Sequence, residues 1–186
     1  QAEECGNLVG EHLQAEPMTS EAAGVTWSGV RLAVRPERKE LRDVAVQMVY
    51  ATLPGSPLLR AVLRLTNLRP TRQQIFIGGS AAFSLGTSQS ALVLHGEGVT
   101  RRPTPWGAWC SGRRWGALED PVSGASVLGV CPQGHLALND LGNTGRELAL
   151  AGRVDLPGEA TREVVWYLYL APDLEAALAM RALARL

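Results

Sequence analysis

Short runs of alternating apolar residues, separated by turns rich in glycine and proline, constrain the fold of this chain more than any other feature. In 44–50 and in 59–65, every second residue along one phase is apolar. Between them stands Leu53-Pro54-Gly55-Ser56-Pro57, a strong turn signal. Alternation of this kind is typical of a strand with one face toward solvent, so the two runs predict an antiparallel hairpin.

The same pattern recurs along most of the chain. Residues 115–118 and 126–130 flank the turn-forming segment 119–124 and predict a second hairpin. Further short strands are expected at 73–77, 81–85, 91–95, 135–138, 147–150 and 163–170. Many short strands separated by 20 glycines and 11 prolines predict an all-β fold, an antiparallel β-sandwich of short strands.

The two ends of the chain differ from this pattern. Residues 1–20 are weakly periodic, and every charged residue before Arg31 is acidic, which predicts an N-terminal acidic arm followed by a single β-sandwich domain over 21–186. At the other end, Asp173 can cap a short C-terminal helix over 173–186. Its apolar residues surround the helix axis, so we expect its own sheet or a partner to cover it on more than one side.

Composition excludes several classes of protein. A hydrophobic fraction of 46% with 19% charged residues argues against disorder, and the formal net charge of zero gives no reason to expect a nucleic-acid partner. No apolar run approaches the roughly 20 residues that span a bilayer, so no transmembrane segment is expected.

The N-terminal residue and the cysteines indicate export. Gln1 is not an initiator methionine, and the Gln-Ala-Glu-Glu start fits what remains after signal cleavage. The three cysteines fit an oxidising compartment, with a disulfide between Cys110 and Cys131 favoured and a pair involving Cys5 as the alternative. We therefore expect an extracytoplasmic location, which is periplasmic, cell-surface or secreted.

The sequence offers little catalytic chemistry. Gly78-Gly79-Ser80 is not a nucleophile elbow, and the histidines and cysteines lack the spacing of a metal site. Glu119 and Asp120 are adjacent acids at a strand end, interpreted as turn residues whose side chains point to opposite faces. No cofactor, no metal and no catalytic residue is predicted, and a non-enzymatic role is favoured over a small hydrolase or lyase.

One segment, 101–115, concentrates aromatic and basic side chains. Its candidate binding residues are Arg101, Arg102, Trp106, Trp109, Arg113, Arg114 and Trp115. Exposed tryptophan rings stack on sugars or bases, and arginines bind carboxylate, sulfate or phosphate. The alternative is structural: the tryptophans cap an end of the sandwich and the arginines stack over them.

Three stretches together carry a resemblance to a known group of proteins. In 115–130, an aromatic-led strand meets an Asp-x-x-Ser-Gly hairpin and a second strand that ends in Gly-Val, and 63–68 and 166–173 are similar to the flanking strands. This pattern resembles the β-sandwich, supersandwich-like domains of bacterial carbohydrate-active proteins. The resemblance implies the fold; it transfers no catalytic residue.

Two functions follow as hypotheses. The first is a non-enzymatic structural or protein-interaction subunit of the cell envelope or of a secreted assembly, with other envelope or assembly proteins as partners. It rests on the expected export, the acidic arm and the C-terminal helix. The alternative is a carbohydrate-binding β-sandwich module with a polysaccharide partner, which would use the Trp106, Trp109 and Trp115 region.

Overall fold

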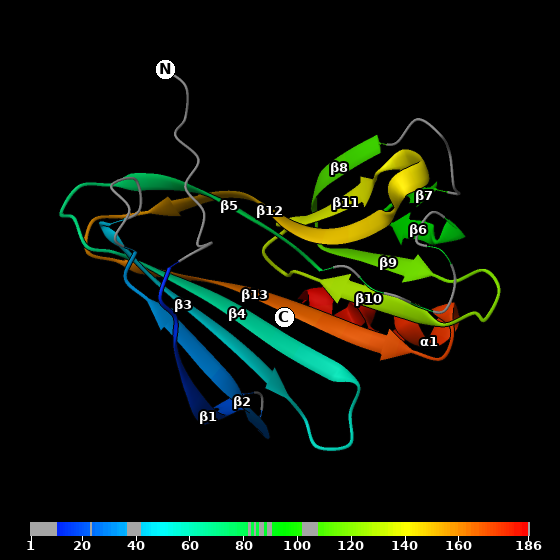
Figure 1. The fold of residues 1–186 in the computed structure, drawn as a ribbon, viewed down its shortest axis with the longest axis horizontal. Helices are drawn as coiled ribbons and strands as arrows, with labels where there is room; N and C mark the ends of the chain where they lie inside the picture. The colour runs from blue at the N-terminus through cyan, green and yellow to red at the C-terminus, as the bar shows by residue number, and fades with distance from the viewer. Residues whose placement is uncertain are drawn as a thin grey trace. The chain divides into compact units, whose positions relative to one another are not determined.

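A computed structural model describes residues 11–22, 24–36, 42–81, 83, 85, 88, 91–101 and 108–185. These residues form two antiparallel sheets and one short C-terminal helix, which confirms the predicted all-β, sandwich-like fold (Figure 1). The chain divides into two compact units, each assembled from separated segments. The first unit is built from residues 1–56, 60–75 and 154–164, and the second from 57–59, 76–153 and 165–186.

The first unit is built around consecutive antiparallel strands. These are β1 (Gln14–Ala22), β2 (Val25–Val34), β3 (Val44–Thr52) and β4 (Leu58–Asn67), which are neighbours in that order, and β4 is followed by β13 (Thr161–Ala171). The hairpin predicted around Pro54-Gly55 is therefore confirmed as β3 and β4. The last residues of the predicted arm, from Gln14 onward, form β1, which is paired residue by residue with β2.

Asn67 organises the end of β4 in the first unit. Its side chain is 1% exposed, and its amide nitrogen donates to the carbonyl oxygens of Thr71, Leu156 and Pro157 at 2.8, 3.2 and 3.0 Å. Its amide oxygen accepts from the backbone of Arg69 and from the Gln73 side chain. This one buried side chain therefore supplies hydrogen-bond partners to polar groups of three chain segments. Backbone groups that are buried away from water need such partners.

The second unit contains the two layers of a sandwich. In one sheet, β13 is followed by β10 (Ser126–Val130), β9 (Trp115–Glu119), β6 (Val93–Gly96) and β7 (Val99–Arg101). In the other sheet the order is β5 (Gln73–Ala81), β12 (Arg146–Leu156), β11 (Leu136–Asp140) and β8 (Ala108–Arg113). Strands β9 and β10 pair in register on either side of the predicted turn, which confirms the second hairpin.

Leu138 fixes the packing of the two sheets in the second unit. It is 1% exposed on β11, and a Cβ added at Gly96 or at Gly116 would overlap its side chain. These two glycines sit opposite each other on β6 and β9. The leucine side chain therefore occupies the space that is open because both facing residues are glycines. Such close packing between layers stabilises a protein core.

The opposite face of the same sheet carries the C-terminal helix. Helix α1 (Leu174–Ala179) continues as a 3-10 helix over Met180–Arg185, and the Asp173 carboxylate accepts from the Ala176 amide at 2.7 Å, as predicted for the N-cap. Ala177 is fully buried against Ala117, Leu128 and Val130 of β9 and β10. Among the described residues, no helix is long and apolar enough to cross a membrane.

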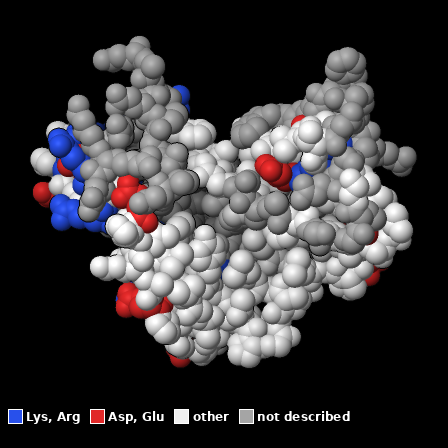
Figure 2. Space-filling model, viewed as in Figure 1, with Lys and Arg blue, Asp and Glu red and all other residues white. Residues whose placement is uncertain are grey.

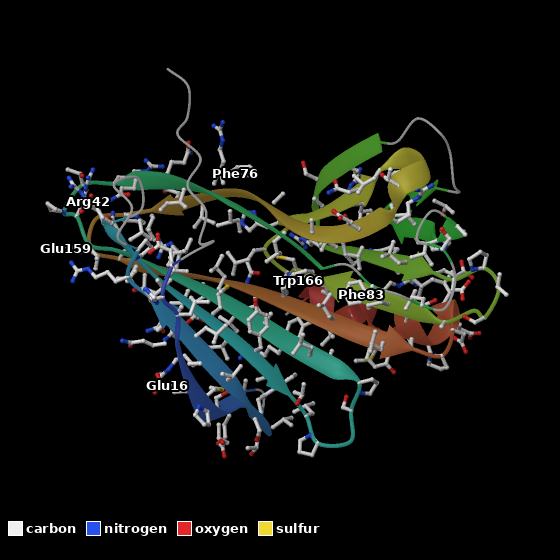
Figure 3. The ribbon with its side chains drawn as sticks, in the orientation of Figure 1. Glu16, Arg42, Phe76, Phe83, Glu159 and Trp166 are labelled. Atoms are coloured by element: carbon white, nitrogen blue, oxygen red, sulfur yellow. The ribbon has the colours of Figure 1, made fainter. Side chains whose placement is uncertain are left out.

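Charged side chains of the first unit form close pairs of opposite sign. Glu16 on β1, labelled in Figure 3, accepts from Arg31 at 2.7 Å, and the Arg31 guanidinium lowers the pKa of this carboxyl below its ordinary value. On the face shown in Figure 2, red and blue groups are small and separate among mostly uncharged described atoms.

Candidate functional site

The structure describes only part of the tryptophan- and arginine-rich segment. Arg102 and Trp106 lie outside the described residues, and Arg101 and Trp109 belong to β7 and β8 without described side chains. Arg114 is exposed. The role predicted for this set as a binding surface stays a prediction.

Trp115, at the start of β9, is half-buried beneath the C-terminal helix. It packs against the apolar cluster that holds Ala177, and the Arg181 guanidinium carbon lies 5.9 Å from its ring centroid. A cation within about 6 Å of a tryptophan ring is attracted by the negative ring face. This tryptophan is thus held by packing and by an arginine stacked on it.

The structure brings together a pair of side chains that sequence reasoning kept apart. His95 on β6 and Glu119 at the end of β9 share a hydrogen bond of 2.7 Å between Nε2 and Oε2. Their side chains are 14% and 26% exposed, so the pair is shielded but in reach of solvent. A hydrogen bond to a carboxylate in such surroundings is stronger than the same bond in water.

The strand register explains why these two side chains meet. His95 is paired with Ala117, and Glu119 is paired with Val93, so the two lie diagonally on one face of adjacent strands. Gly96 and Gly116 point toward Leu138 in the other sheet. Because successive side chains alternate, His95 and Glu119 point to the helix-bearing face, as Trp115 does.

Polar residues continue this row on the neighbouring strands. Thr100 of β7 is the register partner of His95, and Ser126 of β10 is the register partner of Glu119. Helix α1 contacts β9 and β10. The row Thr100, His95, Glu119 and Ser126, with Trp115 on the same face, is called the His95–Glu119 site below.

Asp120, the second of the two adjacent acids, has the structural role predicted for both. The residue is buried, with 1% of its surface exposed. Its carboxylate accepts hydrogen bonds from the Val122 amide at 2.9 Å and from the Ser123 hydroxyl at 2.5 Å. It shapes the hairpin turn. The turn interpretation was therefore wrong for Glu119, whose side chain bonds to His95 instead.

The predicted disulfide between Cys110 and Cys131 is not formed. Both are free thiols: Cys110 lies on β8 in one sheet, while Cys131 follows β10 in the other. The Arg113 Nε donates to the Cys110 sulfur at 2.9 Å, and burial raises the pKa of the Cys131 thiol. The hairpin interpretation failed because these strands belong to different layers; Cys5 lies outside the described residues.

Groups of three or more metal-ligating side chains are absent from the part of the chain that the structure describes. The His95–Glu119 pair supplies one nitrogen and one carboxylate. This donor set suits hydrogen bonding to hydroxyl groups and transfer of a proton. The sequence alone carries no signal for this pair, because the pair depends on how β6 and β9 align.

The fold resembles the β-sandwich folds of carbohydrate-active proteins. The sequence matches no family profile and no curated protein. In structure, it is similar to a putative aldose 1-epimerase from Klebsiella pneumoniae, with a TM-score of 0.68 and 11% identity over 91% of this chain and 57% of that one. This chain thus spans little more than half the length of that neighbour.

Two further solved structures share the fold. A putative aldose 1-epimerase from Escherichia coli K12 has a TM-score of 0.57 and 9% identity over 84% of this chain and 68% of that one. An α-N-acetylgalactosaminidase from Bifidobacterium bifidum, solved with GalNAc, has a TM-score of 0.55 and 14% identity over 85% of this chain and 28% of that one. At these identities the likeness concerns the fold.

Proposed function

We propose that this chain binds carbohydrate at the His95–Glu119 site. The observation that carries the proposal is the half-buried hydrogen bond between His95 and Glu119 on the same sheet face as Trp115. Sugar sites combine an apolar wall with a few fixed polar groups, and a carboxylate and an imidazole offer sugar hydroxyls an acceptor and a second polar partner.

The structural neighbours support this function over the structural subunit. Two carry the description putative aldose 1-epimerase, and a third is a glycosidase solved with a bound sugar. Trp109 belongs to β8 of the other sheet, so it is not part of the His95–Glu119 site, and Trp106 lies outside the described residues; for both, sugar stacking stays a prediction from the sequence. The extracytoplasmic location is part of the proposal, since polysaccharides are met outside the cytoplasm, and cell fractionation of the native source tests it.

Calorimetric titration with a panel of neutral monosaccharides and oligosaccharides, galactose and N-acetylgalactosamine included, tests the binding. Glu119→Gln keeps the shape of the side chain but removes the charge, so the Kd of the bound sugar should rise about 10- to 100-fold. Glu163→Gln is the matched control: Glu163 is an exposed acid of the first unit that pairs with Arg64. The Kd of the sugar for the Glu163→Gln variant should stay within about twofold of the wild-type value.

Two results would contradict this proposal. One is the absence of binding by every sugar of the panel at millimolar concentration. The other is a sugar that binds with the same Kd to wild type and Glu119→Gln.

A second candidate function is proton transfer on a bound sugar. The favouring observation is again the 2.7 Å contact, because a histidine and a carboxylate within hydrogen-bond reach are the usual groups of general acid–base catalysis. Polarimetry of freshly dissolved α-galactose measures anomer interconversion. Catalysis that His95→Ala abolishes supports this candidate, and a rate equal to that of buffer rejects it.

A further inference from the structure

The C-terminal helical segment has apolar side chains on two sides. Toward its sheet, Ala177 is fully buried, and Leu174, Ala176, Met180 and Leu183 pack against the same cluster. A separate hollow on the helical segment is lined by Leu174, Glu175, Leu178, Ala179 and Arg181. Leu178 is outside the cluster that packs on the sheet. Its own sheet therefore leaves part of the apolar helix surface uncovered.

The charges around this hollow are arranged symmetrically about Leu178. Glu175 precedes it by three residues and Arg181 follows it by three; both are exposed, and the Arg181 guanidinium also reaches the Trp115 ring. The whole segment follows the same polarity: Asp173 and Glu175 stand at its beginning, and Arg181 and Arg185 stand toward its end. Acids at the start and arginines at the end also complement the helix dipole.

Such a surface is complementary to itself under a two-fold rotation. If two copies meet with antiparallel helices and with Leu178 on the rotation axis, Glu175 of each copy faces Arg181 of the other. The same rotation brings the two apolar hollows together and opposes the helix dipoles. This self-complementarity is what an isologous interface requires, because each residue pair occurs twice.

We propose that a second copy of this chain docks on the hollow formed by Leu174, Glu175, Leu178, Ala179 and Arg181, to give a two-fold symmetric dimer. Stable dimers bury on the order of 1,200 Å² or more in total. Helical segments of this length, packed alone, bury less than that. The dimer is therefore weak, and it forms in a concentration-dependent way.

Sedimentation equilibrium from about 10 to about 500 µM tests the proposal. The mass of the wild type should rise from the 19.9 kDa of one chain toward twice that value. Glu175→Arg places like charges opposite each other and should weaken the association at least about tenfold. Arg181→Glu should do the same, although it also removes the contact with the Trp115 ring.

The combined variant, Glu175→Arg with Arg181→Glu, restores opposite charges across the two-fold axis. It should recover dimerisation to within about threefold of the wild type, which loss of folding by either single change cannot mimic. Arg162→Glu changes an exposed charge of the first unit and should leave the association unchanged.

A wild type that stays at monomer mass at the highest concentration overturns the proposal. So does a dimer that is indifferent to Glu175→Arg, or a combined variant as weak as the single ones. Another protein bound to this face would leave the purified chain monomeric, which is the same contradicting outcome.

Discussion

The two units of the chain use charged side chains in different ways. Among the described residues of the first unit, five arginines form ion pairs with carboxylates, and most of these side chains are exposed: Arg31 with Glu16, Arg64 with Glu163, Arg42 and Arg69 with Asp43, and Arg72 with Asp155. In the second unit, two pairs are withdrawn from solvent. His95 and Glu119 are half-buried, and Arg146 and Asp140 are 0% and 1% exposed.

This difference is consistent with the proposed placement of the sugar site in the second unit. Exposed ion pairs contribute about 0–1 kcal/mol each and occupy their arginines in structural contacts. A shielded pair interacts more strongly and depends on its surroundings, which suits recognition. It can also be essential to the core: the Arg146 guanidinium lies 3.0 Å from Asp140 and donates to the carbonyl oxygens of Gly142 and Gly145.

The largest expected effect concerns the buried pair of the second unit. Asp140→Ala leaves the Arg146 charge in the interior without its carboxylate, so the free energy of unfolding should fall by about 3–5 kcal/mol. Chemical denaturation measures this change in the free energy of unfolding. The control is Asp155→Ala, which removes the carboxylate of an exposed pair and should cost about 0–1 kcal/mol. Equal losses at both positions would remove the contrast between the units.

A smaller effect is expected where the two sheets of the second unit approach each other. In Gly116→Ala, the new methyl group must displace the Leu138 side chain, which should lower the free energy of unfolding by about 1–3 kcal/mol. Gly79→Ala on β5 meets no atom within 4 Å and serves as the control. If thermal melts place the two variants together, Leu138 does not fix the sheet spacing.

The smallest effect concerns pH and the His135 imidazole, whose pKa is lowered from its ordinary 6.5 by burial. The unfolded chain then binds this proton more readily than the folded one. The stability from neutral His135 is therefore complete above about pH 6.5 and decreases as the pH falls through the lowered folded pKa. His135→Gln should flatten the dependence of unfolding free energy on pH between about 7 and 5.

His12→Gln is the control for loss of a histidine at an exposed position. It should leave the slope of the wild type in place. A slope that His135→Gln does not change would assign the acid sensitivity of the second unit to another group.

The fold was predictable because its signals are local. Alternation and turn residues around Pro54-Gly55 and around 119–124 predict the two hairpins, and Asp173 marks the helix start; all three are observed. The strand β1 was missed because its residues lack an alternating apolar pattern: as an edge strand with most of its side chains exposed, it needs no apolar face.

The site was less predictable because it depends on contacts between distant residues. His95 and Glu119 are 24 positions apart and meet only through the register of β6 with β9. The disulfide failed for the same reason: the assignment of Cys110 and Cys131 to different sheets is a property of topology that spacing does not encode. For Trp115, the sequence marks a residue of the helix-bearing sheet face without indicating the apolar cluster and the Arg181 that it contacts.

The measurement that tests the central claim most directly is an NMR titration of the isotopically labelled chain with the sugar that calorimetry identifies. The account predicts that the largest shifts occur at the His95 imidazole, at the Trp115 indole and at the Thr100 and Glu119 amides, all in the second unit. Shifts that cluster on the ion-paired strands β1 to β4, with these four residues unmoved, would contradict it.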